Sequence, residues 1–162
     1  MKITFPRMGT SYIAIADLFR GLGNEVISPP PITKRTLDLG TRYSPEFACL
    51  PFKILMGTYL EGIARGADTI VSSGGVGPCR AGFYMEMHRR ILWDLGYEVQ
   101  TITLEPPKGH LSDLVQQLRR LIHVPLSQVW DAVRFAWKKL ELLDIIEERA
   151  YYLRPRELVR GS

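Results

Sequence analysis

Short apolar runs alternate with helical patterns through the first two thirds of the chain. Runs that are rich in β-branched residues and too short for helices predict strands at 2–6, 25–28, 68–73 and 97–104. Between these runs, apolar residues recur at every third or fourth position, which predicts helices over 12–22, from 51 to about 65, and over 84–95.

Local signals place the ends of these elements. The Ser11 hydroxyl is positioned to cap the helix that follows it, and Pro51 suits the first turn of the next helix. The stretch 29–50 begins with three prolines and is predicted to be irregular. The helix over 84–95 is expected to bury a stripe of Tyr84, Met87, Ile91 and Leu95.

Strands separated by helices of this length predict a parallel sheet with right-handed crossovers. We therefore expect an α/β fold of the Rossmann-like or flavodoxin-like kind. Its four parallel strands are expected in the order 2-1-3-4, with helices on both faces of the sheet.

Beyond residue 107 the pattern is helical only. One stripe contains Leu111, Leu118 and Leu121, and a second, on a longer helix, contains Val129 and Val133. We divide the chain into an α/β domain over 1–107, which binds a cluster or ligand, and a helical extension over 108–162. Trp130, Trp137, Leu140 and Leu143 make the longer helix apolar, so we expect it to pack on the sheet domain or on a partner, with a homodimer as one arrangement.

Composition and charge exclude several classes of protein. The 162 residues are 46% hydrophobic and 23% charged, as in an ordinary globular protein, and contain neither a bilayer-length apolar run nor a signal-peptide core. The net charge of +4 divides evenly, with +2 in 1–104 and +2 in 105–162. Because no basic tail or patch stands out, we expect no nucleic-acid partner. The lack of a bilayer-length run and of a signal-peptide core predicts no membrane partner and a cytoplasmic location.

The ligand site of such a sheet is expected between the loops after the first and third strands, where the strand order reverses. The first loop offers Gly9, Thr10 and Ser11, and the second offers Gly74, Gly75, Gly77 and Arg80. Glycines let the backbone approach a ligand, and the start of the next helix offers free amides to an anion. The second loop matches neither the P-loop pattern nor G-x-G-x-x-G, so neither ATP nor NAD is indicated.

Both cysteines of the chain, Cys49 and Cys79, stand just before predicted helices at this same edge. The amino end of a helix stabilises a thiolate, which is the form that binds metal or reacts. Lys53 and Arg80 follow closely and offer positive charge to an anionic sulfur or phosphate. The simpler interpretation is that both cysteines are small buried apolar residues, and two thiolates fall short of the four ligands of an iron–sulfur cluster.

The sequence resembles a known family around these cysteines. The motifs PEFACLPFK at 45–53 and GGVGPCR at 74–80, and more broadly residues 1–107, are similar to the amino-terminal part of the CoA protein activases. That family is related to the D-component of 2-hydroxyglutaryl-CoA dehydratase and to benzoyl-CoA reductase subunits.

The resemblance implies an oxygen-sensitive [4Fe-4S] cluster held partly by Cys49 and Cys79, in a protein of anaerobic acyl-CoA metabolism. Members of the family usually continue into a second α/β domain with a further cysteine motif, which this chain lacks. A partner domain or subunit is therefore implied. We expect an iron–sulfur electron-transfer or accessory module of an acyl-CoA dehydratase system. Two alternatives stay open: a metal-free module that binds a nucleotide or CoA phosphate, and a thiol–disulfide switch between the two cysteines.

Overall fold

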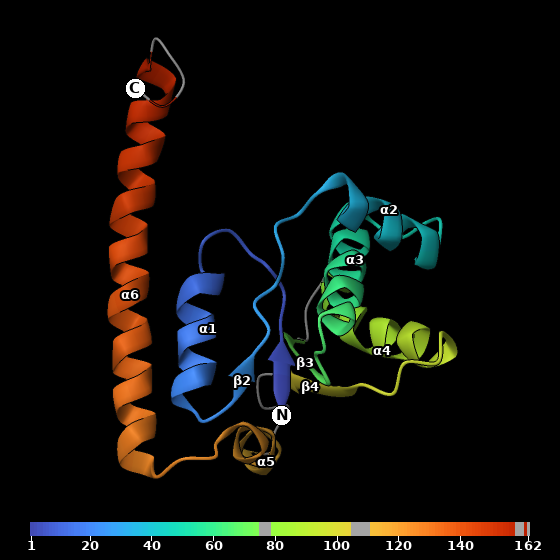
Figure 1. Cartoon of the computed structure of the whole chain (residues 1–162), viewed down its shortest axis with the longest axis horizontal. Coiled ribbons are helices and arrows are strands. Elements are labelled where there is room, and N and C mark those ends of the chain that lie inside the picture. The colour runs from blue at the N-terminus through green and yellow to red at the C-terminus, as the bar shows by residue number, and fades with distance from the viewer. Residues whose placement is uncertain (75–78, 105–110, 158–160, 162) are drawn as a thin grey trace.

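The computed structural model describes residues 1–74, 79–104, 111–157 and 161, with no side chains described at 111–114. Four parallel strands form one sheet in the order β2-β1-β3-β4 (Figure 1). The strands are β1 (Lys2–Thr4), β2 (Glu25–Val26), β3 (Thr69–Ser73) and β4 (Gln100–Leu104). The predicted fold class and strand order are confirmed.

One face of the sheet is covered by α1 (Tyr12–Gly21) and α5 (Leu111–Leu121). Side chains from β1, β3 and β4 meet those of both helices in one core, which contains Ile3, Phe5, Ala16, Phe19, Leu22, Val71, Ile102 and Leu121. The Asn24 side-chain amide donates to the Leu121 carbonyl oxygen at 2.8 Å, which ties the end of α5 to the loop after α1. The helix that opens the predicted extension thus shares the core of the α/β domain.

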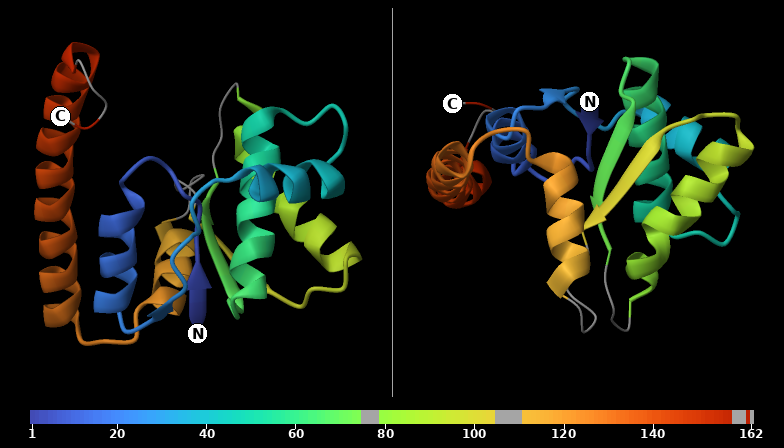
Figure 2. Two further views of the ribbon diagram at one scale, coloured as in Figure 1. Left: turned by 45° about the horizontal axis from the view of Figure 1, so that its top comes forward. Right: turned by 90° about the horizontal axis from the view of Figure 1, so that it is seen from below.

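The other face is covered by α3 (Leu50–Ala64) and α4 (Tyr84–Asp94), with α2 (Lys34–Tyr43) packed outside α3 (Figure 2). The core on this side contains Met56, Tyr59, Leu60, Ile70, Met85 and Leu92. The predicted stripe on α4 is wrong by about one position. Met85, His88 and Leu92 are buried, whereas Met87 and Leu95 are exposed.

The α2 helix corrects the prediction that 29–50 is irregular. Thr33 caps it, because its hydroxyl accepts from the Thr36 amide while the Thr36 hydroxyl accepts from the Thr33 amide. The helix is mostly polar and buries only two residues, so it leaves almost no apolar stripe in the sequence. Gly40 lies against the Lys53 carbonyl of α3, and this close approach holds the two helices together.

The long α6 (Leu126–Leu153) packs along α1 on the outer side of the molecule and extends past the end of α1 (Figures 1 and 2). A short 3-10 turn, η2 (Arg154–Arg156), follows it. An ion pair joins Lys139 to Asp17, and the Lys139 ammonium holds the pKa of that carboxyl below its usual value. In the described parts of the chain, no helix combines the length and apolar character that crossing a membrane requires.

Candidate functional site

Cys49 and Cys79 each occupy the residue before a helical segment. Cys49 is the N-cap of α3, with an extended backbone (φ −69°, ψ 158°) and Pro51 in the first turn after it. Cys79 is the N-cap of η1 (Arg80–Phe83), a 3-10 turn that leads directly into α4. Neither cysteine forms a disulfide, and both are accessible, Cys79 fully and Cys49 in part. The expectation that both are simply small buried residues is therefore wrong.

Tyr84, the first residue of α4, connects the two segments. Its phenol and the Cys49 thiol are hydrogen-bonded to each other. With the phenol as donor, this bond, helped by the Phe52 amide, holds the pKa of the Cys49 thiol below its usual value. The same bond raises the pKa of the Tyr84 hydroxyl to about 12, because the phenol that donates to a thiolate resists losing its proton. The bond therefore makes the Cys49 thiol easier to deprotonate and the Tyr84 phenol harder to deprotonate.

Cys79 and Arg80 act on the same pair. The positive charge of Arg80 also lowers the pKa of Cys49, and a negative charge at Cys79 raises the pKa of Tyr84. Arg80 lowers the pKa of Tyr84 as well, so its charge acts on both members of the pair. Tyr84 thus connects Cys49, through its hydrogen bond, to the helical segment that follows Cys79. The placement of both sulfurs at one cluster stays a prediction.

The Tyr84 ring packs on a set of buried aromatic rings. Tyr84 stands edge-on to Phe52 with ring centroids 5.2 Å apart, and Phe52 stacks on His88 at 4.0 Å. His88 is fully buried, and its Nε2 lies 3.1 Å from the Phe52 carbonyl oxygen, to which it donates. Tyr59, which is edge-on to His88, is also fully buried and donates to the Ser72 hydroxyl at 3.1 Å. This packing fixes the position of the Tyr84 ring beside Cys49.

Two residues of this site, Tyr84 and His88, are not among the predicted site residues. The spacing predicts Tyr84 as part of the core stripe of its helix, and no motif marks His88. The signal that the sequence offers is proximity along the chain, because Tyr84 is the first residue after Cys79 that carries a phenol and it begins a helix. Nothing in the spacing indicated which of the two cysteines its hydroxyl would meet.

Lys53 contacts the backbone of the segment before Cys49. Its ammonium donates to the Glu46 carbonyl oxygen at 3.1 Å, within the segment that leads to Cys49. It therefore shapes the approach to the N-terminus of α3 and adds positive charge near it.

The loop after β1 is engaged by α6. The Thr10 hydroxyl donates to the Glu147 carboxylate at 2.5 Å, while Gly9 has a positive φ of 52° in open space. The predicted cap at Ser11 is wrong: its hydroxyl donates back to the Met8 carbonyl oxygen at 2.5 Å and makes no capping bond. In the second loop, the Gly74 amide donates to the Leu104 carbonyl oxygen at 3.1 Å. The other two predicted site residues of that loop, Gly75 and Gly77, lie outside the described residues.

The two cysteines are the side chains that could contribute ligands to a cluster here. Within the described residues, no three His, Cys, Asp or Glu side chains gather closely enough to hold a metal ion. An iron–sulfur cluster is usually held by four cysteine thiolates. The chemistry of Cys49 and Cys79 fits two of these ligands, because both thiols are free and the pKa of Cys49 is lowered.

Comparison with known proteins adds no further assignment. The chain matches no family model, no curated protein and no solved structure. The residues around Tyr84 therefore carry the functional argument.

Proposed function

We propose that this protein is an iron–sulfur-binding module, for electron transfer or in an accessory role, in an acyl-CoA dehydratase or reductase type of system. One observation carries the proposal. Two free thiols, Cys49 and Cys79, both act on the phenol of the half-buried Tyr84. The motifs that contain the two cysteines, PEFACLPFK and GGVGPCR, supply the acyl-CoA part of the proposal through their resemblance to the CoA protein activases.

The surroundings of Cys49 suit a sulfur that binds iron. Its position at the amino end of a 15-residue helix and the nearby Arg80 charge both favour thiolate over thiol. Thiolate is the form that iron binds, so a lowered pKa at Cys49 reduces the free energy that deprotonation costs when metal enters. A bound cluster would supply one-electron transfer.

Tyr84 has a role distinct from that of a ligand. Its hydroxyl donates to the sulfur of Cys49, and hydrogen bonds to cluster sulfurs are one of the means by which proteins set a reduction potential. Negative charge on a sulfur is greatest in the reduced state, so the donated proton favours reduction. The rings of Phe52 and His88 keep the phenol in place for this role.

Completion of the cluster requires ligands from outside these two cysteines. We propose that a second domain or subunit supplies them by docking against the edge of the sheet that carries Cys49 and Cys79. Both sulfurs are accessible to such a partner, because Cys79 is exposed and Cys49 is partly exposed.

Anaerobic reconstitution tests this function. The purified protein is incubated with ferrous iron, sulfide and a thiol reductant, then desalted, and its iron and acid-labile sulfide are measured together with its visible absorbance. We expect bound iron and sulfide in the wild type, with thiolates of the reductant in the ligand positions that the partner would fill. We expect loss of both iron and sulfide in Cys49→Ser and in Cys79→Ser. Ser73→Ala is the matched control, because it removes an exposed polar group at the end of β3 without touching sulfur.

Two results would contradict the proposal. One is wild-type protein that stays colourless and free of iron while its thiols titrate as free. The other is iron binding that survives loss of either cysteine.

A colourless, iron-free protein would favour a thiol–disulfide switch or a phosphate-binding module. Treatment with oxidised glutathione and with CoA distinguishes these two functions. A thiol–disulfide switch predicts that oxidised glutathione converts the two free thiols to an internal disulfide, seen as a mass loss of two hydrogens. A phosphate-binding module predicts instead that CoA protects the protein against thermal unfolding while both thiols stay free.

A further inference from the structure

An exposed apolar stripe runs along the first half of α6. It consists of Leu126, Trp130, Val133, Trp137 and Leu140, and we call it the outer stripe. Its first four side chains are exposed by 82%, 68%, 43% and 63% respectively. Two tryptophans that are about two-thirds exposed on one helix face are unusual for a surface that only meets water.

The spacing of the outer stripe is that of a helix-pairing seam. Its residues follow one another at intervals of four, three, four and three, which is the repeat of coiled coils and helix bundles. The repeat ends at the next two seam positions, which hold Asp144 and Glu147. The apolar seam therefore covers only the first half of α6.

The outer stripe lies beside the α1 contact. At about 100° per residue, the buried Ala132 and Ala136 and the half-buried Leu143 mark the side that faces α1. The centre of the outer stripe is rotated from that side by about a quarter-turn to a third of a turn. In a four-helix bundle each helix contacts two neighbours through adjacent faces of this kind. The α1–α6 pair thus has the form of half a bundle.

We infer that the outer stripe pairs with the same stripe of a second copy of this chain, with the two α6 helices antiparallel. The stripe is complementary to itself in that orientation. When the pair is centred near residue 135, Trp130 faces Leu140 of the second copy, and Val133 faces Trp137. Each large ring then meets a smaller side chain, and the symmetry repeats both contacts.

The area and the polar atoms of the stripe agree with a dimer of moderate affinity. Since an aromatic side chain buries about 150–250 Å², covering both stripes removes on the order of 1,000 Å², the lower range of specific interfaces. The indole nitrogen of Trp137 donates to the Glu141 carboxylate at 2.8 Å, so burial of that ring leaves no unpaired N–H group.

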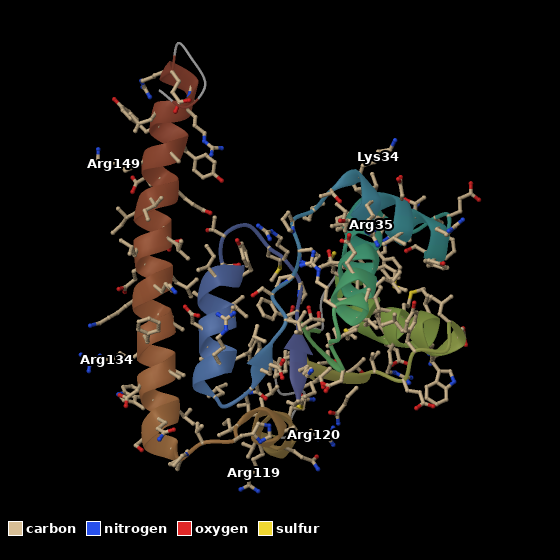
Figure 3. All side chains as sticks on the ribbon, in the orientation of Figure 1. Lys34, Arg35, Arg119, Arg120, Arg134 and Arg149 are labelled. Carbon is tan, nitrogen blue, oxygen red and sulfur yellow. The ribbon has the colours of Figure 1, made fainter. Side chains whose placement is uncertain are left out.

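Arg134 distinguishes the antiparallel arrangement from others. Its side chain points away from α1 (Figure 3). At about 100° per residue, its position on α6 borders the outer stripe. In the antiparallel pair the two copies of Arg134 lie near the two-fold axis and repel each other. We therefore expect the dimer to tighten as salt rises, and Arg134→Gln to tighten it at low salt.

Sedimentation of the full-length, metal-free protein between about 1 and 100 μM tests the inference. We expect a monomer–dimer equilibrium in this range, with tryptophan emission that shifts to longer wavelength on dilution. Exposed Trp93 contributes a constant background. Trp130→Gln combined with Trp137→Gln is expected to raise the dissociation constant at least about a hundredfold, because buried interface tryptophans are hot spots.

The matched control removes two apolar side chains from the opposite flank of α6. Phe135 and Leu142 are 58% and 56% exposed, but Lys139 interrupts their row. Phe135→Gln with Leu142→Gln is expected to leave the dimer intact, with helix content checked by circular dichroism in every variant. A wild type that is monomeric at 100 μM would overturn the inference and favour a different protein or domain as the occupant. So would a dimer that survives loss of both tryptophans or that depends on Phe135 and Leu142.

Discussion

Replacing Gly40 with alanine tests the contact that fixes the start of α3 and, with it, the position of Cys49. A β-carbon built on Gly40 would lie 1.7 Å from the Lys53 carbonyl oxygen and 2.6 Å from its carbonyl carbon. Gly57 makes the reciprocal contact, since a β-carbon there would lie 1.9 Å from the Thr36 carbonyl oxygen. The obstructing atoms are backbone, so no side chain can rotate to make room.

Two opposing effects set the magnitude. Alanine gains about 1 kcal/mol of helix propensity over glycine in a helix interior. Against this, non-bonded heavy atoms prefer separations near 3.5 Å, so α2 and α3 must part by more than about 1 Å. Overpacking of this kind costs about 3 kcal/mol at the upper end of its usual range. The free energy of unfolding of Gly40→Ala is therefore expected to fall by about 2 kcal/mol.

Urea denaturation followed by circular dichroism measures this loss, with reductant present to keep both cysteines free. Thr41→Ala is the control, because Thr41 is the next residue of α2 and its side chain is exposed. It is expected to change the free energy of unfolding by less than about 0.5 kcal/mol. A Gly40→Ala protein as stable as the wild type would show that α2 and α3 are not packed this closely, and would refute the reasoning.

Two further predictions concern single side chains. Tyr84→Phe removes the donor to Cys49, so the pKa of that thiol should rise. Its alkylation by iodoacetamide near pH 7 should then slow several-fold relative to that of Cys79. An unchanged ratio of the two alkylation rates would contradict the hydrogen bond. Burial lowers the pKa of His88 to about 4, so between about pH 6.5 and pH 4 the unfolded chain binds more protons than the folded one. Stability should fall by about 3 kcal/mol as pH drops through this window. His88→Phe should abolish this pH-dependent loss of stability. His123→Gln is the control, because His123 is exposed, and should retain the loss. If the stability of His88→Phe depends on pH as strongly as that of the wild type, the loss belongs to other groups.

The sheet was predictable because its elements bury apolar residues in short, regular runs. The strand at 68–73 and the helix that follows Pro51 are examples, and both appear in the structure with ends shifted by only one or two residues. The α2 helix was not predictable in this way. It is stabilised by a Thr33 cap and by backbone contact at Gly40, neither of which produces hydrophobic periodicity.

Topology alone predicts one part of the site, the position of each cysteine at the start of a helical segment. Parallel strands place Cys49 and Cys79 at one edge, because both precede helical segments that start there. The pairing of Tyr84 with Cys49 depends on how α4 is rotated about its axis. That rotation follows from burial of His88, a polar residue that hydropathy patterns assign to the surface, against Phe52.

The layer order separates the two proposed interfaces. The outer stripe belongs to α6, which lies outside α1 on one face of the sheet, whereas Cys49 begins α3 on the other face. A dimer through α6 therefore places the cysteines of the two copies on the far sides of the assembly. Two copies paired in this way do not complete one cluster from their four thiols. Under the proposed function, the remaining ligands would then come from a partner that docks at the cysteine edge, and a dimer through α6 leaves that edge free to receive it.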